Sequence, residues 1–425
     1  MSVNKNSLII IALIVSKPVI AAETLEQAFA EALNQNQRIL AAKANSQASE
    51  QQLYAAQGQR LPQLYVSTGY TQLSETPTIQ TEVDGQSAAF AASQAGSANA
   101  QAIVSVPVFT SGRISHSVEA AEAAKVAMQH NEVTTALNIK LQVANAFIAI
   151  FRAQKGLLVA QSHVNSLNAH VKDVTNLYQQ GMVARNDLLA SQVELNNAEQ
   201  DVIRNDNQLN IAKAHFNQLL NRDLSTEVDL VEQFPEALRG TLAELGQQAL
   251  SQRPELSTLA LQAHALEQQA ASENASLWPQ VNINGGYQYQ QNRYQVYEGM
   301  WMANATLEWK IYDGSTRHRS KAMSQQAMAL QSQRNDLISH IQLQVRQSWL
   351  DVQETLKRTE VAKSAIAQAD ENLKVSTERY QQGLASHTEV LDAEDLRVTT
   401  HNNFNNARYD AVMAKLNLRR ALGTL

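Results

Sequence analysis

Two kinds of hydrophobic pattern alternate along this chain. The segments 280–290 and 301–312 place apolar residues at odd positions and mostly polar residues at even positions. A period of two predicts β-strands with one apolar and one polar face. The segments 61–71 and 101–109 show the same pattern less cleanly, and we expect each pair of segments to form neighbouring strands. Each run has about 9–12 residues, which suits a tilted strand that crosses a bilayer.

Longer segments instead repeat their apolar residues at steps of three and four. Ser111–Asn176 and Thr316–Arg379 contain no proline, and at 1.5 Å per residue each would form one helix of about 95 Å. Seams such as Leu137 to Phe151 and Ile338 to Val352 approach a heptad repeat, which predicts coiled-coil packing. We expect shorter helices, which stack in pairs along the long ones, over 25–57, 185–222, 242–275 and 387–422.

The chain also repeats itself. Residues 24–64 resemble residues 242–281 at a shift of 217, and the segment 178–195 resembles 380–397 at a shift of 202. An internal duplication constrains the architecture more than any single motif. We therefore expect a first structural repeat over 23–222 with a tip near Gly181, a connector over 223–241, and a second structural repeat over 242–425 with a tip near Gly383.

Residues 1–22 have the pattern of a secretory signal peptide. Lys5 supplies the basic region, Leu8–Val15 is apolar, and small residues end at Ala22. Eight apolar residues are too few to span a bilayer, which needs about 20. Removal of Lys5 and Lys17 would change the net charge from −6 to −8. No later segment has 18 consecutive apolar residues, so we expect no transmembrane helix.

The composition excludes several kinds of chemistry. The chain has no cysteine, which rules out disulfides, thiolate metal sites and lipid attachment at a cysteine. Its acidic balance argues against nucleic acid as a partner. The ten histidines are scattered, and no metalloprotease, hydrolase or nucleotide-binding signature occurs. We therefore expect no catalytic residues, no cofactor and no metal site, and we do not expect an enzyme.

Aromatic residues concentrate around the second pair of strands. Trp278, Tyr287, Trp301 and Trp309 belong to this group, and tyrosine and tryptophan favour the membrane–water interface. The pattern predicts a transmembrane β-barrel. Four strands cannot close one, since the smallest barrels have about eight, so we expect three copies with twelve strands. The alternative is a soluble sheet covered by helices, but the helices lack a wide apolar face with which to cover it.

The stretch 378–425 carries Tyr-x-x-Gly, then Val-Leu-Asp-Ala, Ala-Arg-Tyr and Ala-Leu-Gly. Together with the duplication, this ordered set resembles the TolC family of outer-membrane efflux and secretion channel proteins over essentially all of the mature chain. The resemblance implies an α+β membrane protein and a homotrimer. Its twelve-stranded transmembrane β-barrel, surrounded by outer-membrane lipid, would continue into a twelve-helix antiparallel coiled-coil tunnel across the periplasm.

The same resemblance implies the exit duct of a tripartite efflux pump for drugs, detergents or other small toxic compounds. Its partners would be a periplasmic adaptor, or membrane fusion protein, and an inner-membrane RND, ABC or MFS pump. Two alternatives stay open. One is the outer-membrane component of a type I protein secretion system, and the other is a periplasmic coiled-coil scaffold without a pore.

Four residues at the expected tips are candidates for function. Gly181 and Gly383 stand where each long helix must turn back, a position that favours glycine because it needs positive φ. By resemblance, both tips would face the adaptor. Glu389 and Asp392 are three residues apart and share one helix face. Helix geometry alone favours an ordinary solvated face, whereas the resemblance implies an acidic gate at the periplasmic end.

A closing latch is only partly matched. Tyr380 and Asp187 correspond to a hydrogen-bonded pair that joins neighbouring coils in the family. The arginine that braces the closed state there aligns with Ala385 in this chain. Arg185 and a protonated His387 are the candidates to replace that arginine.

Overall fold

A computed structural model of the chain describes residues 22–83, 85–236 and 240–425. The expected signal peptide lies outside the described residues, apart from Ala22. The chain divides into two compact units, which are taken in turn. The tip unit holds the residues up to Asn36 together with Ile139–Arg239 and Ser348–Arg419, and the sheet unit holds Gln37–Asn138, Gly240–Gln347 and Arg420–Leu425.

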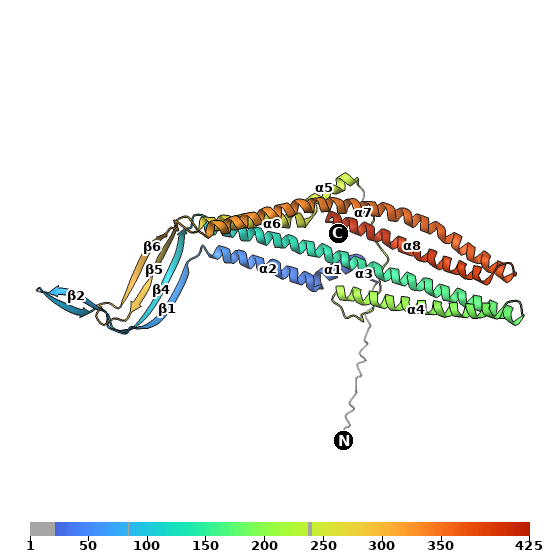
Figure 1. The fold of residues 1–425 in the computed structure, drawn as a ribbon, viewed down its shortest axis with the longest axis horizontal. Helices are drawn as coiled ribbons and strands as arrows, with labels where there is room; N and C mark the ends of the chain where they lie inside the picture. The colour runs from blue at the N-terminus through green and yellow to red at the C-terminus, as the bar shows by residue number, and fades with distance from the viewer. Residues whose placement is uncertain (1–21, 84, 237–239) are drawn as a thin grey trace, which may run out of the picture. The chain divides into compact units, whose positions relative to one another are not determined.

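Four antiparallel strands form the main sheet of the sheet unit (Figure 1). They are β1 (Gln63–Gln72), β4 (Gly96–Phe109), β5 (Gln280–Gln290) and β6 (Gly299–Glu308), in the order β1-β4-β5-β6. The central pair, β4 and β5, joins the two halves of the chain. Pairing within each half follows the sequence pattern, while the pairing between halves was not predicted. Strands β1 and β6 are the edges of this sheet.

The register places residues of like polarity on the same face, because partners across a ladder point the same way. One row of cross-strand partners runs Val66, Ala102, Tyr287 and Trp301. The next row on this face holds Leu64, Val104, Gly285 and Ala303, and the row after it holds Val106, Ile283 and Ala305. The opposite face carries the row Gln63, Ser105, Asn284 and Asn304. The sheet therefore has one apolar and one polar face, as its alternating sequence predicts.

Three features of the strands differ from the prediction, the first being that β4 begins at Gly96 instead of at residue 101. A further hairpin, β2 (Thr78–Val83) and β3 (Gln86–Ala91), projects from the sheet (Figure 1). The strand expected over 301–312 ends at Glu308. Beyond its end, Asp313 accepts hydrogen bonds from the Ser315 backbone and the Thr316 hydroxyl, at 2.8 and 2.7 Å. These contacts bend the chain into the helix that follows.

Each opening helix is broken where one helix was expected. The segment 25–57 forms α1 (Leu25–Gln35) and α2 (Gln37–Gly58), and the segment 242–275 forms α5 (Leu242–Gln252) and α6 (Pro254–Ala275). The breaks fall at Asn36 and Arg253, which correspond at the shift of 217. Pro254 explains the second break, since the residue before proline avoids helical backbone angles. No comparable signal precedes the first.

The break residues are buried and bind the ends of the returning helices. In the tip unit, Asn36 donates from Nδ2 to the Leu219 carbonyl at 2.8 Å, where α4 (Arg185–Leu219) ends. In the sheet unit, Arg253 donates to the Ala421 carbonyl at 3.1 Å, in the last turn of α8 (His387–Leu422). The last carbonyls of a helix have no partner within the helix, so each break satisfies one of them.

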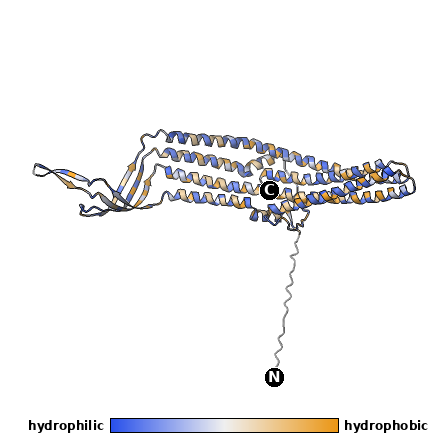
Figure 2. Ribbon diagram, turned by 60° about the horizontal axis from the view of Figure 1, so that its bottom comes forward, coloured by the Kyte–Doolittle hydropathy of each residue, from blue (hydrophilic) through white to orange (hydrophobic). Residues whose placement is uncertain are grey.

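Two long helices carry the rest of the fold. They are α3 (Arg113–Gln179, 67 residues) and α7 (Thr316–Gln381, 66 residues), and hydrophilic and hydrophobic residues are interspersed along them (Figure 2). By length and hydropathy α3 is a candidate membrane span. The sequence predicts none, because no segment has 18 consecutive apolar residues. Of its most apolar window 44% is buried inside the protein, and core helices pass the same test of length and composition.

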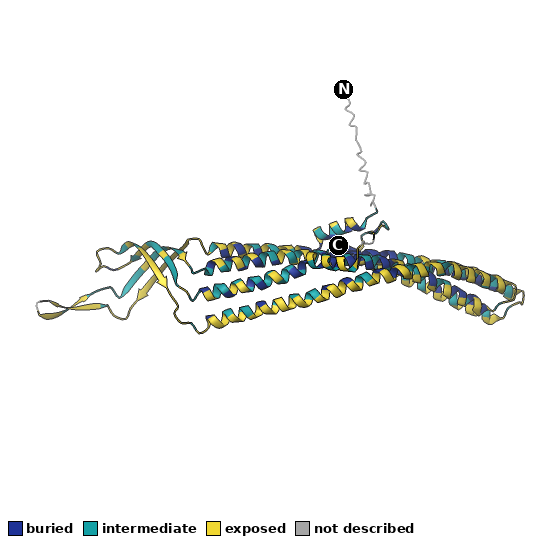
Figure 3. Ribbon diagram, turned by 90° about the horizontal axis from the view of Figure 1, so that it is seen from above, coloured by how far each residue is buried: buried dark blue, intermediate teal, exposed yellow. Residues whose placement is uncertain are grey.

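An aromatic cluster forms the core of the tip unit, where buried residues gather on the helices (Figure 3). Phe147 is fully buried, with its ring centroid 5.4 Å from Phe151, 6.0 Å from Phe216 and 6.2 Å from Phe234. Tyr409 closes the cluster and donates from its hydroxyl to Glu232 at 2.8 Å. Because Phe234 and Glu232 belong to the expected connector, this cluster fixes the connector against α3, α4 and α8.

Truncating Phe147 tests this core. We expect Phe147→Ala to destabilise the protein by about 3–5 kcal/mol, because it leaves a cavity among three other rings. Thermal unfolding followed by circular dichroism in detergent measures the loss. Gln161→Ala, on the exposed side of the same helix, is the matched control and should change little. Equal melting temperatures for the two variants would contradict the core assignment.

Candidate functional site

The two tip turns of the tip unit have the same geometry. In the first, the Gly181 amide donates to the Tyr178 carbonyl and the Met182 amide to the Leu177 carbonyl, both at 2.9 Å. In the second, Gly383 donates to the Tyr380 carbonyl at 2.9 Å and Leu384 to the Arg379 carbonyl at 2.8 Å. This pattern closes a helix C-terminus through one residue of left-handed conformation.

Gly181 and Gly383 supply that conformation, with φ of +70° and +73°. An added Cβ would meet nothing within 4 Å at either position, so backbone angle rather than space requires glycine there. The next residue at each tip is a large apolar one. Met182 is 66% exposed and Leu384 is 65% exposed, so both tips present an apolar side chain to solvent.

Glu389 lies in the first turn of α8 and is part of a capping box. Its amide donates to the Ser386 hydroxyl oxygen at 3.3 Å, and its carboxylate accepts a hydrogen bond from the Ser386 amide at 3.1 Å. Arg379 lies 3.8 Å away. The hydrogen bond from the Ser386 backbone, helped by the Ser386 hydroxyl and by Arg379, lowers the pKa of Glu389. Asp392 is exposed one turn further along the helix.

The predicted tyrosine–aspartate pair is near but not hydrogen-bonded. Tyr380 is buried, with 5% of its surface exposed, and its hydroxyl has no hydrogen-bond partner among the described residues. Burial, and secondarily the charge of Asp187, raise the pKa of Tyr380. Ala385, at the position of the bracing arginine, instead packs against the apolar cluster of Val174, Tyr380 and Val390. Arg185 is exposed at the start of α4.

A histidine pair beside Tyr380 was not predicted as a contact. His170 Nε2 lies 3.1 Å from His387 Nδ1, and the two rings stack with centroids 5.1 Å apart. The Tyr380 ring is tilted against both, at centroid distances of 5.4 and 6.1 Å. Burial, followed by the charge of His387, lowers the pKa of His170 to about 4. Burial also lowers the pKa of His387.

One heptad further from the tip, a second pair of polar residues is buried between α3 and α8. His163 and Glu394 are both buried, and Glu394 accepts a hydrogen bond from the Ser166 hydroxyl. Burial raises the pKa of Glu394. The sequence signal for this polar seam was the spacing of seven residues between His163 and His170, matched by the same spacing between His387 and Glu394.

The aromatic residues of the sheet unit lie at two levels. Tyr287 and Trp301 are direct cross-strand partners with ring centroids 5.4 Å apart. Trp278 precedes β5 and Trp309 follows β6 at the other level. All four are exposed, from 40% for Tyr287 to 82% for Trp301.

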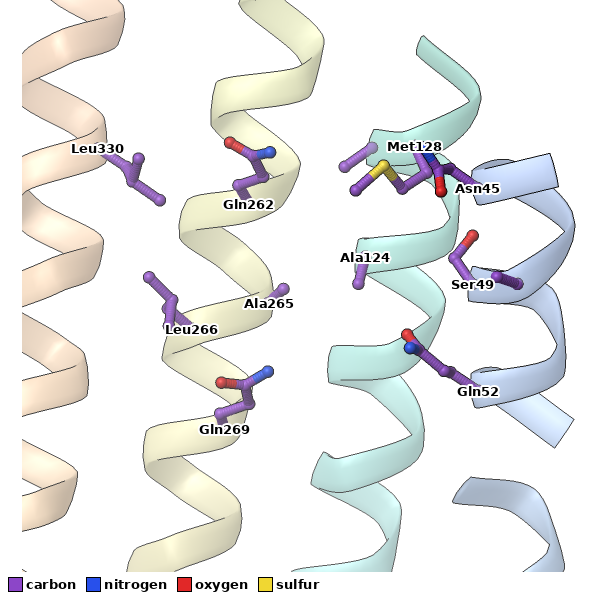
Figure 4. Close-up of a pocket in the computed structure, with 12 residues that line it drawn as sticks. Asn45, Ser49, Gln52, Ala124, Met128, Gln262, Ala265, Leu266, Gln269 and Leu330 are labelled. Atoms are coloured by element: carbon purple, nitrogen blue, oxygen red, sulfur yellow. The ribbon is translucent and has the colours of Figure 1, made fainter. Parts of the chain in front are cut away.

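A groove of about 570 Å³ lies between helices of the sheet unit (Figure 4). Small and amide side chains line it, and none of its lining residues is ionisable. The described residues also contain no group of three or more histidine, aspartate or glutamate side chains able to hold a metal ion. The groove therefore offers neither acid–base groups nor metal ligands. Its lining includes Asn45, Ser49, Gln52, Ala124, Gln262 and Gln269.

Comparison with known proteins gives a consistent result. A family model described as "Outer membrane efflux protein" matches residues 28–222 and 245–424. "Outer membrane protein TolC" of Vibrio cholerae serotype O1 is 21% identical over 417 residues, which cover 95% of this chain and 91% of that protein.

Solved structures share the fold. The outer-membrane channel OprN matches with a TM-score of 0.79 at 17% identity, over 94% of this chain and 90% of that one. CusC matches with a TM-score of 0.80 at 15% identity, over 94% and 91%. The outer membrane protein VceC of Vibrio cholerae matches with a TM-score of 0.77 at 18% identity, over 94% and 96%. The α+β fold with internal duplication is thus confirmed.

The capping box at the second tip can be tested directly. Ser386→Ala should speed amide hydrogen exchange in the first turn of α8 by roughly two- to thirtyfold, because an N-cap side chain is lost. It should raise the pKa of Glu389 only in part, because the hydroxyl is lost while the Ser386 amide, the larger cause of the lowered pKa, remains. Ser364→Ala, at an exposed position within α7, should leave this exchange unchanged. Unaltered exchange at the start of α8 in Ser386→Ala would show that the cap contributes nothing.

Proposed function

Because the chain belongs to the outer membrane efflux protein family, we propose that it is the outer-membrane exit duct of a tripartite efflux pump. It would pass drugs, detergents or other small toxic compounds to the exterior. The family is one of transport proteins located in the outer membrane. We propose accordingly that the chain carries no catalytic activity and that an inner-membrane pump supplies the energy.

The open sheet is the observation that carries this proposal. Its apolar face is exposed, with Val66 at 75%, Ile283 at 47% and Leu307 at 64%. Its edge strands β1 and β6 have no further partner strand among the described residues. In a membrane an unpaired strand edge costs several kcal/mol per polar group. Three copies joined edge to edge would remove all edges in a barrel of twelve strands.

The spacing of the aromatic residues supports a membrane position for this sheet. Trp301 in β6 and Trp309 just after it are eight residues apart, which corresponds to about 26 Å along the strand and to about 19–22 Å across the bilayer at a tilt of about 35–45°. Membrane barrels carry an apolar band about 25 Å tall between two aromatic girdles. We propose that Tyr287 and Trp301 lie at one interface and Trp278 and Trp309 at the other.

We propose that the two tips bind the periplasmic adaptor and form the gate of the channel. The exposed side chains Met182 and Leu384, held out by Gly181 and Gly383, would offer an apolar surface to a periplasmic adaptor protein. In a trimer, Glu389 and Asp392 would contribute six carboxylates around one opening, which would attract cations. A hydrogen bond from the Tyr380 hydroxyl, which has no partner among the described residues, to Asp187 would form in the assembled trimer and stabilise the resting, closed tip.

Assembly and conductance test the duct against a scaffold without a pore. The protein should migrate as a trimer when unheated and should conduct as single channels in planar bilayers. Ile283→Arg should destabilise the inserted barrel by about 2–4 kcal/mol if it lies near the bilayer midplane, because it puts a charge on the lipid face. Asn304→Arg, on the polar face of the adjacent strand, is the matched control and should assemble. A stable monomer without conductance would overturn the proposal.

The acidic gate has a separate test. Glu389→Gln with Asp392→Asn should lower the preference for cations, because the ring of negative charge is lost. Glutamine still accepts the capping bond from Ser386, so trimer stability should hold. Asp395→Asn, also exposed on α8, controls for loss of charge as such. Reversal potentials in asymmetric salt measure the selectivity, and an unchanged value in the double variant would return both residues to an ordinary solvated face.

A further inference from the structure

The contact between α3 and α8 in the tip unit is unusually polar at its buried centre. His163 and His170 on α3 and His387 and Glu394 on α8 are each at most 8% exposed. Coiled-coil seams normally bury apolar side chains at such heptad positions, and polar groups there lower stability. Four titratable groups in one seam therefore call for a role other than packing.

His170 and His387 are the pair closest to the tip, and they join the two hairpins. His170 belongs to α3, which turns back at Gly181, and His387 begins α8, which follows Gly383. Their nitrogens are 3.1 Å apart, so one ring donates and the other accepts. On its other side, His387 Nε2 lies 3.5 Å from the Ser191 hydroxyl of α4, which donates to the Asp187 carbonyl at 2.8 Å.

We propose that the His170–His387 contact is a proton-operated latch, which holds the two hairpins of the tip together at neutral pH and releases them in acid. The inference rests on the proposed function, since it assigns a regulation to the periplasmic end of the duct. The latch stands beside Tyr380 and Ala385, where the side chain of Ala385 offers no ionic brace.

The physical reason lies in the protonation states of two facing imidazoles. In the neutral pair, the N–H of one ring donates a hydrogen bond to the unprotonated nitrogen of the other ring. When both rings are protonated, both nitrogens are donors and two positive charges stand 3.1 Å apart. In a buried site such charges repel strongly and lack water. Separation of α3 from α8 relieves both penalties.

The sign follows from the lowered pKa values. The pKa of His170 is about 4 with the tip closed, whereas a solvated histidine has a pKa near 6.5. The closed tip is therefore fully stable above pH 6.5 and loses stability as the pH falls toward 4. For His170 alone, the ratio of closed to open tips should fall about thirtyfold between pH 8 and pH 5.

Other charged groups face the pair and limit this effect. Asp173 on α3 raises the pKa of His170, and Asp187 on α4 raises that of His387. Tyr380 on α7 is neutral throughout this range, since its pKa is raised. Glu394 on α8 acts in the opposite direction: its raised pKa favours the closed tip once the carboxyl is protonated. Neither aspartate contacts the pair through a hydrogen bond that would replace the latch.

Distance measurement tests the latch independently of transport. The chain has no cysteine, so spin labels can be placed only at introduced positions. Cysteines at Lys172 on α3 and Thr388 on α8, both exposed, report the separation of the two helices in the full-length protein. We expect the label distance to lengthen or broaden between pH 7.5 and pH 5. His170→Gln with His387→Gln should abolish this change, because glutamine keeps a hydrogen bond but takes up no proton.

Single-channel conductance gives the second readout. Wild-type conductance should rise as the pH falls from 7.5 to 5, and the double glutamine variant should stay at its neutral value. His340→Gln, at an exposed position in the sheet unit, should respond as wild type does. Glu394→Gln, which fixes a neutral side chain, should keep the acid response and so separate it from the carboxyl group.

The outcomes distinguish the latch from the duct. A protein that conducts but whose label distance and conductance ignore pH overturns the latch alone. The latch is equally overturned when the double glutamine variant keeps the wild-type response. Absence of conductance at every pH removes the proposed function, while an acid-dependent label distance in that protein would still support the latch as a conformational device.

Discussion

The fold depends on hydrogen-bond donors for the last carbonyl groups of its two returning helices, α4 and α8. Both α4 and α8 end among buried residues, where Leu220 and Leu422 are fully covered. Water cannot reach the last carbonyls there, so the protein must supply donors. It does so by breaking each opening helix at one residue and turning that side chain, Asn36 or Arg253, onto the end of the returning helix.

The two repeats solve this problem with different chemistry. Asn36 offers a neutral amide, while Arg253 also pairs with Glu255 at 2.9 Å. The two tips also differ, in how deeply their corresponding tyrosines are buried. Tyr178 is 39% exposed in the first tip and its counterpart Tyr380 is 5% exposed in the second. Duplication kept the backbone geometry of the tips but not the burial of their tyrosines, and the buried polar seam takes His163 and His170 from the first repeat and His387 and Glu394 from the second.

Much of this arrangement follows from local sequence pattern. Alternation over 280–290 predicts the strand and its faces, and glycine at the end of a long apolar repeat predicts each tip turn. The break at Asn36 and the hairpin β2–β3 were missed because asparagine and short polar strands carry weak local signals. The pairing of β4 with β5 was missed because it joins residues far apart in sequence.

Some residues of the candidate site could likewise be selected from the sequence, while one of its contacts could not. Glu389, Tyr380 and the glycines could be selected from the sequence, since each stands in a recognisable motif. Contact between His170 and His387 depends on how α3 lies against α8, a relation that no single helix encodes. Even the spacing of seven residues shows only that each helix presents its polar residues to one side. Tertiary packing decides which histidine meets which.

The unpaired strands β1 and β6 have a consequence for the life of the protein before it reaches the membrane. In the proposed trimer the sheet edges close only against other copies, so the stability of the sheet would depend on protein concentration. Until then its apolar face and free backbone groups form a template for wrong pairing. Correct association of the strands would therefore compete with aggregation while the protein is being produced. The rate of export, and the escorts that keep the strands apart during transit, would then limit how many ducts a cell obtains.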